Sequence, residues 1–162
     1  MHSRAAEFIR ALNLQPHPEG GYFREIFRSP HRVQPPDDRD ERSALTTIYF
    51  LLTDKSYSRF HRVRSDEVWH FYEGSILQLI WIEPDMKQYH HCLLGPVSDE
   101  SKPVQIVPAG CWQAARTTSA YSLVGCTVGP GFEFKDFAMI SDFREEAETI
   151  QERFPELKMF LK

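Results

Sequence analysis

Short runs of apolar, aromatic and β-branched residues recur along most of the chain, and Gly, Pro and Asp residues separate them. Within several runs the apolar and polar positions alternate, a period of two that is typical of strands. The pattern predicts strands at residues 22–28, 45–52, 58–64, 67–72, 76–83, 88–94, 104–107, 112–116 and 121–128. Short strands at this even spacing favour an antiparallel barrel or sandwich over alternating strand and helix units, with a jelly roll as the natural candidate.

The two ends of the chain have a helical period instead. Near the N-terminus, the spacing i, i+3, i+4, i+7 is held by Ala5, Phe8, Ile9 and Leu12. Ser3 is the expected cap, and Asn13 with the prolines that follow ends the helix. Near the C-terminus, an apolar stripe is held by Ile150, Phe154, Leu157 and Leu161. Asp142 and Glu145 have capping-box spacing, and Pro155 is expected to break this helix into two pieces.

The segment after the first strand differs from both patterns, because Pro30, Pro35, Pro36 and the charged run 37–42 predict an exposed, mobile loop. No repeat, low-complexity tract or second domain is evident. We therefore predict an all-β fold with flanking helices: one domain over residues 1–162, a barrel core at about 19–140, and terminal helices packed outside. At 162 residues with 41% hydrophobic content, such a domain buries a core without disulfides.

Charge and cysteine content narrow the functional classes. Nineteen Lys and Arg residues stand against 23 Asp and Glu residues, spread along the chain, so neither nucleic acid nor an acidic membrane is an expected partner. No signal-peptide-like or membrane-spanning run is present, which predicts a cytoplasmic protein. Cys92, Cys111 and Cys126 lack Cys-x-x-Cys spacing, which argues against a disulfide framework or thiolate metal site. Cys111 and Cys126 are expected to be small buried side chains.

The most informative chemistry lies around residues 60–74, where Arg64-Ser65-Asp66 separates two predicted strands. His61 precedes this turn and Glu67 follows it. If the two strands fold side by side, the imidazole and the carboxylate converge. Burying a carboxylate without a partner costs several kcal/mol, so an interior His61⁺/Glu67⁻ pair would be a candidate acid/base couple.

A second motif lies downstream at Pro108-Ala109-Gly110-Cys111-Trp112-Gln113. Together, His-x-Val-x-x-x-Glu before Gly74 and Pro-x-Gly-x-x-Gln resemble the paired signature of the cupin superfamily. Further strings, Pro18-Glu19-Gly20-Gly21-Tyr22-Phe23-Arg24-Glu25 and Leu123-Val124-Gly125-Cys126-Thr127-Val128-Gly129-Pro130-Gly131-Phe132, resemble its domain-of-unknown-function 985 branch, also called cupin type 5. The resemblance covers residues 5–140 and implies a jelly-roll barrel, but no established activity.

In cupins the two motifs supply three His and one Glu to a metal. Here Val63 and Gln113 stand where the family has His, which leaves His61, Glu67 and Gln113 as candidate ligands for manganese, nickel or zinc. One imidazole, one carboxylate and one amide make a thin ligand set, because a catalytic zinc usually takes three protein ligands of stronger kinds. No cofactor is therefore predicted with certainty. Gln113 has the alternative role of orienting Glu67 or a ligand.

Other candidate ligand contacts are aromatic or lie on the first strand. Four aromatic residues either line a pocket or, as the favoured interpretation for most of them, fill the barrel: Trp69, Phe71, Trp112 and Phe132. His70 falls on the opposite face from Glu67, which favours an interface or surface contact. Tyr22 and Arg24 share one face of an edge strand and Glu25 lies on the other. This strand either pairs with a second copy in a homodimer or is an ordinary charged edge.

The leading functional hypothesis is a small-molecule enzyme of the isomerase, epimerase or lyase type, acting through His61 and Glu67 on a sugar-like or oxygen-rich substrate. A non-catalytic small-ligand binding protein is the rival, and a metal-dependent enzyme is the third possibility. Attraction to a charged His61 and desolvation shift the Glu67 pKa in opposite directions, and the sequence does not decide between them.

Overall fold

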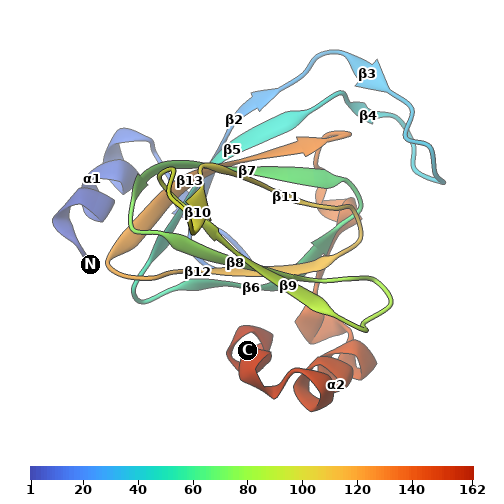
Figure 1. Ribbon diagram of the computed structural model, residues 1–162. Coiled ribbons are helices and arrows are strands. Elements are labelled where there is room, and N and C mark those ends of the chain that lie inside the picture. The colour runs from blue at the N-terminus through green and yellow to red at the C-terminus, as the bar shows by residue number, and fades with distance from the viewer.

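The computed structural model describes residues 1–162 and consists of two facing sheets with helices outside them (Figure 1). The first sheet has the order β1 (Gln15–Pro16), β2 (Tyr22–Arg28), β5 (Thr46–Thr53), β13 (Tyr121–Gly129), β7 (Asp66–Gly74) and β11 (Val104–Val107). The second has the order β10 (Ser101–Lys102), β9 (Tyr89–Leu94), β8 (Leu77–Ile82), β12 (Trp112–Thr117), β6 (Tyr57–Val63) and β14 (Phe137–Met139). Only β9 and β10 pair in parallel. The result is a jelly-roll-like barrel, and all nine predicted strands are confirmed.

Alternating side chains explain how the sheets are buried. Inward residues such as Phe50, Trp69 and Leu79 form one core between the sheets. The second sheet is buried on its outer face as well, because Ile80 and Trp112 pack beneath the C-terminal helices. A sheet covered on both faces loses the simple apolar and polar alternation.

The N-terminal helix α1 (Ser3–Ala11) covers the outer face of the first sheet, where Phe8 packs with Leu51 and Leu123. The N-cap is His2, whose Nδ1 accepts the Arg4 backbone N–H at 3.2 Å, so the prediction of Ser3 as cap is wrong. Ser3 is instead the first helical residue. The helix ends before Asn13, which has a φ of 52°.

The C-terminal helices lie beneath the second sheet (Figure 1). α2 (Arg144–Arg153) and the 3₁₀ helix η3 (Pro155–Leu161) are separated where Pro155 was expected to break the helix. The predicted capping box is wrong, because Asp142 belongs to the preceding 3₁₀ helix η2 (Ile140–Asp142) and no side chain caps α2. None of the helices has the length and apolar character needed to cross a bilayer.

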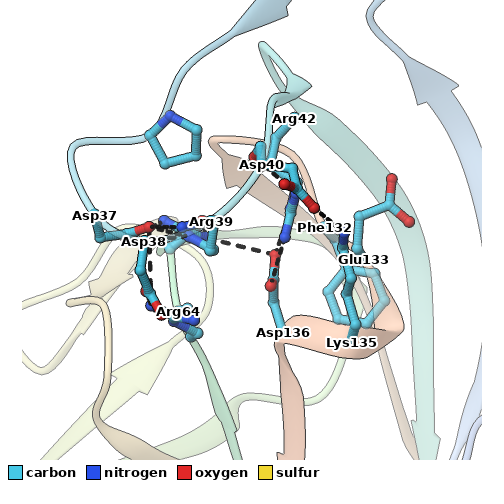
Figure 2. A network of polar contacts seen from close by, with 12 residues as sticks. Asp37, Asp38, Arg39, Asp40, Arg42, Arg64, Phe132, Glu133, Lys135 and Asp136 are labelled. Atoms are coloured by element: carbon cyan, nitrogen blue, oxygen red, sulfur yellow. Dashed lines mark hydrogen bonds and ion pairs between the residues drawn. The ribbon is translucent and has the colours of Figure 1, made fainter.

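The segment predicted as an exposed, mobile loop forms a hairpin of β3 (Arg32–Val33) and β4 (Arg42–Ser43) that projects from the barrel (Figure 1). The Arg39 and Arg42 side chains are each only 3% exposed. Figure 2 shows both guanidinium groups directed toward Asp136, in the 3₁₀ helix η1 (Phe134–Asp136). The loop is therefore anchored by buried charge, and the prediction of exposure fails for these arginines.

The strands that carry His61 and Glu67 do not lie side by side. β6 belongs to the second sheet and β7 to the first, so the turn at Arg64 and Ser65 crosses between the sheets. His61 and Glu67 consequently approach the interior from opposite walls. This corrects the predicted hairpin but still brings both side chains to the same cavity.

Candidate functional site

A cavity of about 90 Å³ lies between the two sheets, with the segment 132–137 as part of its wall. Its buried imidazole and carboxyl side chains are His17, Glu19, His61 and Glu67. Its aromatic lining consists of Phe23, Phe50, Phe132, Phe134 and Phe137. A small group of acid/base side chains is thus enclosed by phenyl rings, where electrostatic interactions are less screened than in water.

Glu67 is held in place by a directed chain of hydrogen bonds. Trp69 Nε1–H, which can only donate, bonds to Gln113 Oε1 at 3.1 Å. This fixes the amide orientation, so that Gln113 Nε2 donates to Glu67 Oε2 at 2.5 Å. Gln113 does not line the cavity. Its role is therefore to orient Glu67, one of the two roles considered for it.

Burial decides the ionisation of Glu67. Desolvation raises the pKa of this carboxyl from 4.5 to about 7, and the hydrogen bonds from Gln113 and the Cys126 thiol oppose the shift. Desolvation therefore outweighs the stabilising contacts, which answers the question that the sequence left open. Near neutral pH the group can accept or release a proton, as a general acid/base residue requires.

The partner of His61 is Glu19 rather than Glu67. Glu19 Oε2 lies 3.2 Å from His61 Nε2, and Glu19 Oε1 accepts a hydrogen bond from Ser58 Oγ at 2.8 Å. Burial, and then the charge of Glu67, raise the pKa of Glu19 well above its usual range. Burial also lowers the pKa of His61 to about 4. Both shifts favour the uncharged forms, so in place of the expected His61⁺/Glu67⁻ couple the structure has a Glu19–His61 pair in which burial opposes charge on either group.

The orientation of His61 follows from its other nitrogen. Nδ1 lies 2.8 Å from the Arg59 carbonyl oxygen, which can only accept, so Nδ1 carries the proton. Nε2 then carries no proton and can accept a hydrogen bond from the Glu19 carboxyl. The dyad can therefore move a proton between Glu19 and Nε2 at the surface of the cavity.

His17 and Glu19 were not among the predicted site residues. Burial lowers the pKa of His17 to about 3, and its ring packs edge-on against Phe23 at 4.5 Å between ring centroids. The sequence did contain a signal for Glu19, because Glu19 and the two glycines after it belong to the string 18–25, which resembles the family's sequence. Gly20 and Gly21 both have positive φ, so this segment turns sharply beside the barrel.

Only some of the other predicted ligand-contact residues lie at the cavity. Glu25 and Phe132 line the cavity, whereas the remaining candidates lie elsewhere. Trp69 and Phe71 pack in or against the core between the sheets, as the core interpretation predicted. Trp112 lies in the outer core, where its Nε1–H donates to Glu146 at 2.5 Å.

Three candidates from β2 and β7 also lie away from the cavity, and β2 is not the outermost strand of its sheet, because β1 pairs with its first two residues. Tyr22 packs against the cluster beneath α1, and Arg24 Nη1 donates to the Leu12 carbonyl oxygen at 3.1 Å. His70 is partly buried and does not line the cavity. The homodimer through β2 stays a prediction.

The residues proposed as metal ligands do not fit a divalent ion in this arrangement. No group of three or more His, Cys, Asp or Glu side chains is positioned to hold one. The Gln113 oxygen accepts from Trp69, and its N–H faces Glu67, so the amide offers no free oxygen to the cavity. Val63 supplies no donor. The chemistry of the site is therefore derived from its own acids and bases.

Burial of Glu67 predicts a pH-dependent stability difference between the protein and Glu67→Gln. A pKa raised on folding contributes stability that is present below pH 4.5 and lost as the pH rises through about 7. The shift corresponds to roughly 3 kcal/mol. Urea unfolding from pH 4 to 8 should show the wild type losing about this much relative to Glu67→Gln. Both proteins keep the buried histidines, so the contributions of these histidines to the pH dependence of stability cancel in the comparison. A stability difference that does not change with pH would contradict the raised pKa of Glu67.

Comparison with known proteins supplies the family. A family model described as "Cupin superfamily (DUF985)" matches residues 6–140. An uncharacterized protein of Saccharomyces cerevisiae is 26% identical over 153 residues, which cover 85% of this chain and 76% of that protein. The match to the family model confirms the resemblance found in the motifs.

Solved structures agree with this match. A hypothetical protein from Leishmania major is 34% identical with a TM-score of 0.84, covering 97% of this chain and 96% of that chain. A protein from Shewanella oneidensis is also 34% identical, with a TM-score of 0.81 and coverage of 97% and 94%. The oxalate decarboxylase of Lactobacillus farciminis is 12% identical with a TM-score of 0.58, covering 88% of this chain and 38% of that one, and this likeness shows the fold alone. The chain belongs to the DUF985 family of the cupin superfamily.

Proposed function

We propose that this protein is a small-molecule enzyme that transfers protons within the barrel cavity, in a reaction of the isomerase, epimerase or lyase type. One observation carries the proposal: Glu67 and the Glu19–His61 dyad line the same cavity, with Glu67 on the first sheet and His61 on the second. Two acid/base groups facing one bound molecule can remove a proton at one position and return it at another. Such reactions need no redox partner.

Glu67 and the Glu19–His61 dyad are suited to different steps of the proton transfer. Glu67 titrates near pH 7 and is partly ionised at neutral pH, so it can act as the base. Burial favours the protonated form of Glu19, which can act as the acid, with His61 Nε2 as its proton relay. Groups with separated pKa values are the usual basis for assigning acid and base roles.

The aromatic lining favours a substrate with an acidic C–H beside a carbonyl over a strongly hydroxylated sugar. Five phenylalanines surround the polar groups. Each sugar hydroxyl that faced them would lose its hydrogen bonds to water without replacement, a cost of about 1–3 kcal/mol per group. A carbonyl compound has fewer polar atoms to satisfy.

Hydrogen–deuterium exchange tests the proposal without knowledge of the natural substrate. Dihydroxyacetone and 2-hydroxyacetophenone would be incubated with the protein in D₂O, and loss of the α-proton signal followed by NMR. We expect exchange well above the buffer rate for at least one compound. The double variant Glu19→Gln/Glu67→Gln should reduce it to background, and the exposed-site control Glu100→Gln should not change it.

The alternative function, a binding protein without turnover, predicts a different result. The same compounds would then bind, as detected by saturation-transfer NMR, but their α-protons would exchange no faster than with the double variant. Exchange that the double variant retains would equally contradict the proposal, because the two carboxyls would then not be its source.

A further inference from the structure

We infer that His17 is the residue that binds the substrate's carbonyl oxygen, and that the cavity takes a small, flat, uncharged carbonyl compound. The inference deepens the proposed function and depends on it for the catalytic step, although not for binding. It begins from the one imidazole in the cavity wall whose second nitrogen has no partner within the chain.

The tautomer of His17 follows from its contacts. Its Nδ1 lies 3.3 Å from the Glu19 backbone nitrogen, and a backbone N–H can only donate, so Nδ1 accepts. The neutral ring therefore carries its proton on Nε2. Every fully buried polar side-chain atom in the protein has a hydrogen-bond partner. Because Nε2 has no partner in the chain, it must retain accessible surface, and the ring lines the cavity.

The surroundings keep this donor neutral and fixed. The His17 side chain is only 7% exposed, and its ring contacts Phe23, Phe50 and Phe137 in edge-on geometry with centroid distances of 4.5 to 5.9 Å. A charged imidazolium would lose its hydration there. The one carboxyl beside the ring, with Glu19 Oε2 3.5 Å from Nδ1, is itself driven by burial toward its uncharged form. A neutral N–H in such a site is a hydrogen-bond donor for a carbonyl oxygen.

The charges of the site select an uncharged ligand. Arg28 is the one cationic side chain in the cavity lining. Its guanidinium already bonds to Glu25 at 2.8 Å, to Glu133 at 3.0 Å and to the Phe132 carbonyl oxygen at 3.0 Å. A carboxylate or phosphate would therefore meet no free cation and would be repelled by ionised Glu67. Substrates with these groups are disfavoured.

The shape of the apolar wall selects a flat body. Phe132, Phe134 and Phe137 lie edge-on to one another at 5.1 to 6.1 Å between centroids. Phenyl rings at such distances offer faces and edges to a further planar group, and edge-to-face packing contributes about 0.5–1.5 kcal/mol beyond buried area. The small cavity limits the ligand to about one ring with a short side chain.

The reaction step is an enolisation that balances without an added reagent. The Glu67 carboxylate takes the proton from the carbon beside the carbonyl. The electron pair of that C–H bond forms a carbon–carbon double bond, and the carbonyl π pair moves to oxygen. His17 Nε2–H donates to this oxygen as its negative charge develops. Glu67 exchanges its proton with solvent and returns one to the same face of the enolate, which gives isotope exchange with retention. Inversion at that carbon requires that the Glu19–His61 dyad deliver the proton to the other face.

Binding can be tested separately from proton transfer. The probes are acetophenone labelled with ¹³C at the carbonyl and ethylbenzene, which has the same ring without the oxygen. We expect acetophenone to bind about 5- to 10-fold more tightly, the value of one hydrogen bond, with a downfield shift of the bound carbonyl resonance. His17→Phe should abolish the preference and the shift, whereas His17→Gln, which keeps a donor, should retain part of both.

The outcomes separate the inference from the proposed function. Equal affinities of the two probes for the wild type, or an unchanged carbonyl shift in a folded His17→Phe, would overturn the inference even if α-proton exchange is found. A carbonyl preference that depends on His17, in a protein that exchanges no α-protons, would support the inference and reject the proposed turnover. Near-ultraviolet circular dichroism checks that His17→Phe is folded, and His17→Gln provides the same test if it is not.

Discussion

Replacing Glu67 by glutamine is expected to lower the rate of α-proton exchange by about 10²–10⁴-fold, the usual contribution of a positioned general base. The substitution is nearly isosteric, and the new amide oxygen can still accept the hydrogen bond from Gln113. It removes only the ability to take a proton. In the wild type the rate should rise with pH through about 7, because only the ionised carboxyl is a base. Initial rates from pH 5 to 9 by NMR measure both effects.

Gln113→Leu provides a matched control for this profile. The leucine removes the donor that stabilises ionised Glu67, so the midpoint should move above pH 7 while the rate at high pH stays within about tenfold of the wild type. A purely structural role for Gln113 would lower the rate equally at every pH. The assignment of Glu67 as base fails if Glu67→Gln keeps its rate, or if the wild-type rate falls with rising pH.

The strands could be predicted because their signal is local. In β7, Glu67 and Trp69 point inward while Val68 and His70 point outward, a period of two that the sequence displays directly. Which strands face each other is not local. β6 and β7 are joined by a two-residue turn that would suit a hairpin, yet they belong to different sheets, because β6 pairs with β12 and β14, both distant in the sequence.

The side of each strand that faces the cavity was harder to predict where both faces are buried. In β12, Trp112, Gln113 and Ala114 are all buried, because the core covers one face and the C-terminal helices cover the other. Alternation assigns Trp112 and Gln113 to opposite faces but does not say which is inside. The sequence pattern is therefore equally compatible with Trp112 in the pocket, whereas the structure places it on the outer face.

Glu19 and His17 escaped prediction because their burial depends on distant contacts. Glu19 lies in a connection rich in Pro and Gly, which by itself indicates an exposed turn. Its side chain becomes buried when Ser58 donates to it, and its backbone oxygen accepts the Arg59 N–H at 2.9 Å. Contacts across about 40 residues are a property of the fold, and no local pattern reports them.

The second large effect is expected where the loop of the β3–β4 hairpin contacts η1, in Asp136→Ala. Asp136 accepts from Arg42 Nε at 2.7 Å and Nη2 at 2.9 Å, and Arg39 Nη1 lies 3.5 Å away (Figure 2). The alanine would leave two buried guanidinium groups without this partner. Breaking a buried pair costs 3–5 kcal/mol, and because this one lies just under the surface we expect about 3 kcal/mol.

That loss corresponds to a decrease in Tm of about 6–12 °C for a chain of this size, measurable by calorimetry or urea unfolding. Asp38→Ala is the matched control, because Asp38 pairs with Arg64 in the same network but has a side chain that is 83% exposed. It should leave Tm unchanged. Asp136 also ends η1, between Phe134 and Phe137 of the cavity wall, so α-proton exchange should fall in Asp136→Ala even below its Tm. Equal Tm values for both variants would show that the buried charges do not hold this wall in place.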